Sequence, residues 1–184
     1  MRLFIALELS GEQKDEVISL QDKLKSYLDG VRWVKPAGMH LTLKFLGDTE
    51  PQKVEQVKEA MDNAVLDLES FEVSYGRGGI FPSPAKAKVI WLGLNDGEDN
   101  VIKLAQKVER ALQDYGFAPD KREFTPHLTI GRIKKRIPKN IIEQFIDQEK
   151  TFQTAKFKIE EVVLFESQLT PQGAIHTPLH QSRL

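Results

Sequence analysis

The stretch HLTLKFLG at residues 40–47 returns in shortened form as HLTIGR at residues 127–132. The two copies lie about half the chain apart, and each has the apolar alternation typical of a strand. The chain contains only 4 histidines, so two chance occurrences of His-Leu-Thr are improbable. The repeat therefore predicts two structurally similar lobes placed face to face, each built around one copy.

Strands and helices alternate on both sides of these copies, which indicates an α+β or α/β protein. Helices are expected over residues 11–28, 50–68, 101–115 and 139–149. Strands are expected over residues 3–9, 31–34, 40–46, 71–80, 88–94 and 126–133, within 152–166, and near 175–179.

The repeated motif presents one imidazole and one hydroxyl on the same face of each strand. Residues two apart on a strand share a face, so His40 lies beside Thr42 and His127 beside Thr129, while the intervening apolar residues point into the core. Two opposed imidazoles can act as general base and general acid, one neutral and one protonated at working pH. Hydroxyl donors between them suit anionic oxygens. In-line displacement at phosphorus fits this arrangement, because water enters on one side of the phosphorus and an alkoxide leaves on the other.

Phe45 and Arg132 occupy equivalent places, five residues after each histidine. Strict alternation directs both away from the histidine face, so they reach it only where the strand twists or bulges. Core packing is the simpler expectation for Phe45 and a surface position for Arg132. At the site, the ring would stack on a base and the guanidinium would bind phosphate. The segment 121–136 has six basic residues and one acidic residue, which favours an anionic ligand.

Composition excludes several classes of protein. The net charge of −1 argues against binding long nucleic acid by bulk charge, but not against a short or terminal RNA substrate. The chain has no cysteine, which excludes disulfides and thiol nucleophiles. Catalytic zinc normally takes three protein ligands, and Pro178 separates His176 from His180, so we expect no metal. We also expect no cofactor, no membrane association and a cytoplasmic location.

The chain resembles the two-histidine phosphodiesterase superfamily in four stretches of sequence. They are the opening MRLFIALEL, the two motifs HLTLKFLG and HLTIGR, and the central GIFPSPAKAKVIWLGL. Within it, the chain is most similar to RNA 2′,3′-cyclic phosphodiesterases, also called 2′-5′ RNA ligases. The resemblance covers nearly the whole chain and implies one bilobal domain over residues 1–184. It implies an α+β fold with pseudo-two-fold symmetry, two antiparallel sheets flanking a central cleft, and helices on the outside.

The resemblance also implies an activity and roles for residues. RNA 2′,3′-cyclic phosphate ends would be hydrolysed to 2′-phosphomonoesters without metal, with His40 as proton donor and His127 as proton acceptor. Thr42, Thr129 and Arg132 would bind the phosphate. The implied substrates are RNA ends, including tRNA-like fragments, and small 2′,3′-cyclic nucleotides.

Two alternatives accompany this reading of the sequence. The reverse reaction would join a 5′-hydroxyl to the cyclic phosphate through a 2′-5′ linkage. An RNA-end binding module with incidental catalysis would keep the basic segment without needing two titrating histidines. His176 departs from the family pattern, because relatives often carry an aromatic residue in a Gly-x-Ile-Tyr-like ending.

Overall fold

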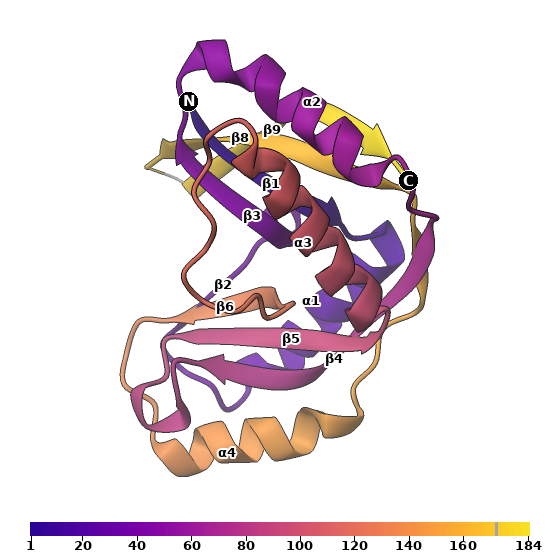
Figure 1. The fold of residues 1–184 in the computed structure, drawn as a ribbon. Coiled ribbons are helices and arrows are strands. Elements are labelled where there is room, and N and C mark those ends of the chain that lie inside the picture. The colour runs from indigo at the N-terminus through magenta and orange to yellow at the C-terminus, as the bar shows by residue number, and fades with distance from the viewer. Residues whose placement is uncertain (172) are drawn as a thin grey trace.

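The computed structural model describes residues 1–171 and 173–184, which form four α-helices and nine strands (Figure 1). The helices are α1 (Gly11–Lys25), α2 (Val54–Val65), α3 (Glu98–Gln113) and α4 (Lys139–Gln148). The strands are β1 (Arg2–Glu8), β2 (Val31–Trp33), β3 (His40–Asp48), β4 (Phe71–Phe81), β5 (Val89–Asp96), β6 (Leu128–Ile133), β7 (Phe157–Ile159), β8 (Glu161–Thr170) and β9 (Gly173–Arg183). Short 3-10 turns cover Pro36–Gly38, Pro51–Lys53, Pro84–Lys86 and Glu149–Thr151.

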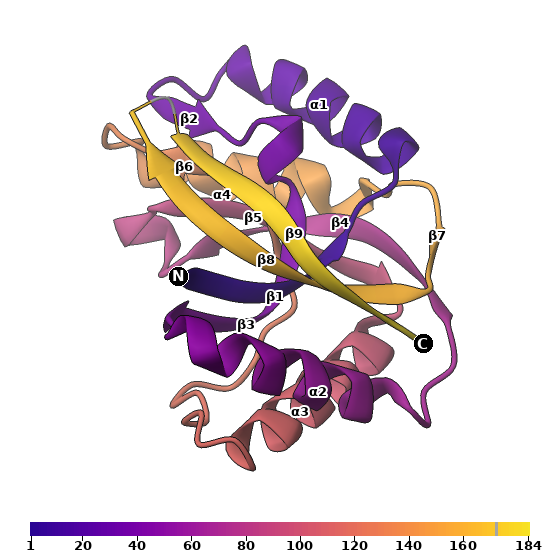
Figure 2. The same cartoon turned by 90° about the horizontal axis from the view of Figure 1, so that it is seen from above.

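The strands form two antiparallel sheets, which confirms the predicted α+β class. One sheet has four strands in the order β3-β1-β8-β9, and the other has five in the order β2-β6-β5-β4-β7. Helices α2 and α3 pack together, α3 contacts β3 and α2 contacts β9, whereas α4 contacts β4. Figure 2 shows α1 and α4 on one side of the molecule and α2 and α3 on the other.

Helix α1 is tied to the five-stranded sheet although it follows a strand of the other sheet. The side chain of Ser10 caps its first turn in a reciprocal capping box with Gln13. Farther along the helix, the buried Gln21 donates hydrogen bonds of 2.9 Å to the carbonyls of Val34 and Ile130. Ile130 belongs to the second motif, so α1 is fixed directly to the strand that carries it.

The predicted elements are all present, with shifted boundaries. The helix expected over 50–68 begins with the 3-10 turn Pro51–Lys53 and continues as α2, because proline suits the first turn. The last expected strand, near 175–179, extends into the eleven-residue β9, which pairs along its length with β8. Among the described residues, no helix is long and apolar enough to cross a membrane.

The two sheets repeat one arrangement of three strands. The first motif strand β3 pairs with β1, which pairs with β8, just as β6 pairs with β5 and β5 with β4. The registers also correspond, since Ala6 pairs with Thr42 in the same way that Trp91 pairs with Thr129. This match confirms the pseudo-two-fold organisation that the sequence repeat predicts.

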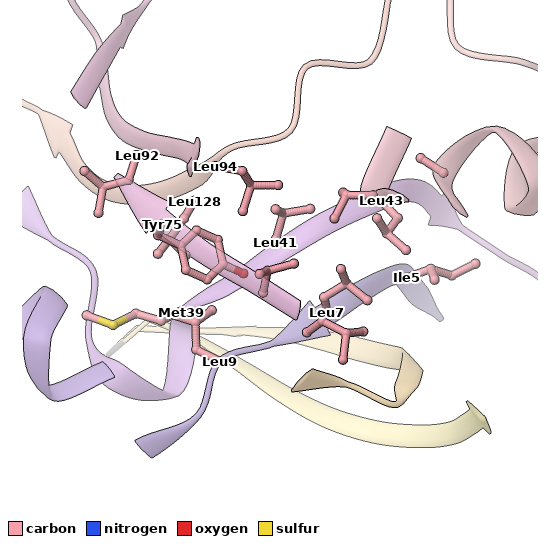
Figure 3. Packing of buried hydrophobic residues seen from close by; sticks show 14 of the residues in the cluster. Ile5, Leu7, Leu9, Met39, Leu41, Leu43, Tyr75, Leu92, Leu94 and Leu128 are labelled. Atoms are coloured by element: carbon pink, nitrogen blue, oxygen red, sulfur yellow. The ribbon is translucent and has the colours of Figure 1, made fainter. Parts of the chain in front are cut away.

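The apolar residues of both motifs are buried, as predicted. Leu41 and Leu128 are fully buried, and both belong to a core cluster that includes residues of both sheets (Figure 3). Because one cluster joins the two sheets, we propose that residues 1–184 form a single domain.

We expect Leu41→Ala to destabilise the whole protein by about 2–5 kcal/mol, since it leaves a cavity in this shared core. The two tryptophans, Trp33 and Trp91, both lie on the five-stranded sheet and report its unfolding by fluorescence. Their transition and the far-ultraviolet dichroism should shift together in urea. Leu66→Ala, at a residue that is 80% exposed, is the control and should change stability by less than about 0.5 kcal/mol. A fluorescence transition unmoved by Leu41→Ala would contradict a single domain.

Candidate active site

The first motif strand contains a β-bulge after Thr42. Consecutive residues of β1 pair with Thr42 and Lys44, so Leu43 is an extra residue in the ladder. Leu43 and Lys44 are both buried, and the alternation restarts with Phe45, which is 68% exposed. The Phe45 ring lies 6.1 Å from the ring of Phe4. The expectation that Phe45 packs in the core is therefore wrong, because the extra residue returns it to the histidine face.

The second motif strand has the same irregularity at the same place. Consecutive residues of β5 pair with Thr129 and Gly131, so Ile130 is the extra residue, and Ile130 and Gly131 are both buried. Arg132 follows on the exposed side. Its charge is one of the causes that lower the pKa of His40, so Arg132 lies close enough to the first motif to act on it. Strands β3 and β6 are also in contact.

His127 is held in one orientation by its backbone and by aromatic neighbours. Its Nδ1 lies 2.7 Å from the carbonyl oxygen of Thr125, and because a carbonyl can only accept, Nδ1 carries a proton. In the neutral ring, Nε2 then has a free lone pair. The ring meets Phe81 edge-on at 5.0 Å and Trp91 at 6.2 Å. Trp91 fits there because Gly79, its partner on β4, has no Cβ to collide with the indole.

His40 packs against an aromatic surface on the equivalent face of the other sheet. Its ring lies 4.7 Å from Phe4 and 6.3 Å from Phe165. Phe4 and Phe165 belong to a second buried cluster, separate from the main core, with Ala6 and Val163. His40 is half-buried on this apolar surface.

A third histidine, His176, completes the surroundings of His40. Its ring meets that of His40 edge-on, with 5.1 Å between centroids and an interplanar angle of 89°, and lies 5.0 Å from Phe4. Its Nδ1 is buried without a hydrogen-bond partner among the described residues. The sequence analysis missed this contact. The sequence did indicate an extended segment around His176. The place of His176 in the sheet, however, is set by its pairing with Ser167 on β8, which the sequence pattern does not show.

His180 does not share this position, although it lies on the same strand. Leu179 is an extra residue in the β8–β9 ladder, so the alternation changes between His176 and His180. His180 Nε2 instead lies 2.8 Å from Asp62 Oδ1 on α2. Within the described residues, no three side chains of the metal-binding types lie close enough together to hold a metal ion.

The surroundings of His40 favour its neutral form. Its pKa is lowered to about 4, first by burial, then by the charge that His176 carries when protonated, and then by the positive charges of Lys14 and Arg132. Burial also lowers the pKa of His176. Glu8 lies opposite His40 on β1 but does not offset these effects. His40 is therefore neutral near pH 7 in the free protein. This differs from the expectation of a protonated imidazole, which used the ordinary histidine pKa.

The two threonines accompany the histidines as predicted. Thr42 and Thr129 are half-buried, and in the described part of the chain their hydroxyls make no hydrogen bond. The corresponding faces of the two sheets thus carry the imidazole of His40, the imidazole of His127 with its Nδ1 hydrogen-bonded to a carbonyl, two hydroxyl donors and the guanidinium of Arg132. Such a set can bind a tetrahedral anion and transfer protons on either side of it.

Comparisons with known proteins identify a family and several similar chains. Residues 21–170 match the 2′-5′ RNA ligase superfamily. The RNA 2′,3′-cyclic phosphodiesterase of Methanothermobacter thermautotrophicus is 33% identical over 184 residues, which is 100% of this chain and 99% of that protein. The protein of the same name from Thermotoga maritima is 32% identical, covering 98% of this chain and 94% of that protein.

Solved structures share the fold. The protein TT0787 of Thermus thermophilus has a TM-score of 0.82 at 23% identity, covering 100% of this chain and 98% of that one. Escherichia coli LigT complexed with 3′-AMP has a TM-score of 0.79 at 22% identity, covering 100% of this chain and 97% of that one.

We expect His176→Gln to raise the pKa of His40 from about 4 towards the ordinary value, because the substitution removes the charge that His176 carries when it is protonated in the same acidic range. Burial remains the larger cause, so the pKa should stay below 6.5. Nuclear magnetic resonance titration of the His40 ring measures the shift directly. His180→Gln, on the same strand but bonded to Asp62, is the matched control and should leave the titration unchanged. An unmoved His40 titration in His176→Gln would contradict the coupling of the two rings.

Proposed function

Because the chain belongs to the 2′-5′ RNA ligase superfamily, we propose that it hydrolyses RNA 2′,3′-cyclic phosphate ends to 2′-phosphomonoesters by acid–base catalysis between His40 and His127. It is an RNA 2′,3′-cyclic phosphodiesterase, a hydrolase, like its full-length relatives. The observation that carries the proposed mechanism is the matched position of the two histidines at the start of corresponding strands, His40 as the first residue of β3 and His127 immediately before β6, with the charge of Arg132 acting on His40.

His127 is the proton acceptor in this mechanism. The hydrogen bond from Nδ1 to the Thr125 carbonyl leaves Nε2 able to take a proton from the attacking water. The oxygen of that water forms a bond to phosphorus, and the bond from phosphorus to the 3′ oxygen breaks. The 2′ oxygen keeps the phosphate.

His40 is the proton donor and gives its proton to the departing 3′ oxygen. Since it is neutral in the free protein, it must gain that proton when substrate binds. The negative charge of the cyclic phosphate offsets the charges of Arg132 and Lys14, two of the causes of the low pKa. Substrate binding therefore raises the pKa of His40 and prepares the acid only when the leaving oxygen is present.

The remaining groups bind the non-bridging oxygens of the phosphate. The hydroxyls of Thr42 and Thr129 donate hydrogen bonds, and the fork of Arg132 supplies charge-assisted ones. The exposed ring of Phe45 offers a surface on which the terminal base can stack. This scheme needs neither metal nor cofactor.

The substrates follow from this chemistry. They are RNA chains ending in a 2′,3′-cyclic phosphate, tRNA-like fragments included, together with small 2′,3′-cyclic nucleotides. By microscopic reversibility, the same site can join a 5′-hydroxyl to the cyclic phosphate as a 2′-5′ linkage, although the high concentration of water favours hydrolysis.

We expect His40→Ala and His127→Ala each to lower turnover of an RNA with a 2′,3′-cyclic phosphate end by about 10²-fold or more. The position of the product phosphate, resolved by nuclear magnetic resonance of phosphorus, should be 2′. His180→Ala serves as a control for loss of an imidazole outside the site. If the protein were an RNA-end binding module, the unmodified protein would bind such RNA without turnover. Near-normal turnover in either variant would refute the acid–base pair.

We expect Arg132→Ala to lower kcat/KM on the order of 10²-fold and Arg132→Lys to restore it only in part, because an ammonium cannot replace a planar fork. Stability should change by less than about 0.5 kcal/mol, since Arg132 is exposed. The pKa of His40 in the free protein should rise in Arg132→Ala, which separates an effect at the site from a general loss of structure. Full activity in Arg132→Ala would place the guanidinium outside the site.

A further inference from the structure

Strand β2 breaks the correspondence between the two sheets. The four-stranded sheet ends at the motif strand β3, whereas the five-stranded sheet continues beyond the motif strand β6 to β2. The β2 strand therefore adds side chains beside the second motif that have no counterpart beside the first.

The register of β2 places two arginines against each other. Arg32 pairs directly with Arg132, so the two side chains lie on the same face of the sheet, and both are exposed. Like charges directly opposite on neighbouring strands destabilise a sheet. Among the described residues, neither arginine forms an ion pair that would offset this repulsion. The pair therefore costs stability unless an anion lies between or above the two guanidinium groups.

The position of this pair connects it to the active site. The charge of Arg132 reaches His40, and so does that of Lys14 on α1. The carboxylate of Asp29, in the turn before β2, lies 3.9 Å from Lys135 and not beside Arg32. Arg32 is thus a further cation directly beside Arg132, on the exposed face that β2 and β6 share.

We propose that Arg32 forms a second phosphate subsite, which binds the phosphodiester that joins the terminal nucleotide to the rest of the RNA chain. The inference rests on the proposed function, in which Arg132 binds the terminal cyclic phosphate. Neighbouring strands lie about 4.8 Å apart, and the long side chains of two arginines on them reach two separate phosphates. A mononucleotide has no such second phosphate. Arg32 therefore selects RNA ends over small cyclic nucleotides.

The experiment compares two substrates, a short RNA with a 2′,3′-cyclic phosphate end and a 2′,3′-cyclic mononucleotide, at two salt concentrations. We expect Arg32→Ala to lower kcat/KM for the RNA about 5- to 10-fold at low salt and to leave the mononucleotide unchanged. Arg32→Lys should retain part of the RNA activity, because an ammonium still attracts the chain phosphate. Arg110→Ala, which removes one exposed arginine from α3, is the control for loss of bulk charge.

Binding of the product RNA, with its 2′-phosphate, is measured in parallel by fluorescence anisotropy, so that the subsite is tested even if turnover fails for reasons in the proposed function. The slope of log Kd against the logarithm of the salt concentration should decrease by about 0.7 in Arg32→Ala. This is the change expected when a protein loses one phosphate contact to a single strand. The thermal midpoint should stay the same or rise, because the repulsion between the two arginines is gone. The proposal would be overturned if Arg32→Ala lowered kcat/KM equally for both substrates or left RNA binding unchanged. It would also be overturned if Arg110→Ala weakened RNA binding as much as Arg32→Ala does.

Discussion

The bulge in each motif strand decides which side chains share a face with the histidine of that motif. In a regular strand, residues an odd number of positions apart point to opposite faces. Phe45 and Arg132 lie five positions after His40 and His127, so a regular strand would turn them away from the histidines. One inserted residue, Leu43 in β3 and Ile130 in β6, reverses the phase while the inserted side chain itself stays in the core. The histidine and threonine before each bulge then share a face with the residue after it, which is Phe45 in the first motif and Arg132 in the second.

The two histidines have similar positions but different electrostatic surroundings. His127 donates from Nδ1 to a backbone carbonyl, which fixes the tautomer that a base requires. His40 packs on phenylalanine rings, and burial first, with the charges of His176 when protonated, Lys14 and Arg132 after it, lowers its pKa. The proposed mechanism uses this difference in environment to assign acid and base roles to two chemically identical side chains. The pseudo-two-fold symmetry of the backbone is thus not shared by the electrostatic surroundings of the two histidines.

The alternation of apolar and polar residues in the sequence was sufficient to predict much of this arrangement. Alternation within the two motifs correctly placed Leu41 and Leu128 in the core and paired each histidine with its threonine. It could not predict the bulges, because an extra residue is recognised only by the register with the neighbouring strand. The contact of His176 with His40 was missed for the same reason, since β9 joins the sheet through β8, far from the first motif.

Each lobe carries a helix that follows a strand of the other lobe in the chain. Helix α1 follows β1 of the four-stranded sheet but is bonded to Ile130 in the other sheet, and α3 follows β5 of the five-stranded sheet but packs on β3. If the repeat arose from duplication of a smaller unit, each unit now lacks a helix that the other holds. Neither lobe can be cut out, swapped or recombined as a separate module.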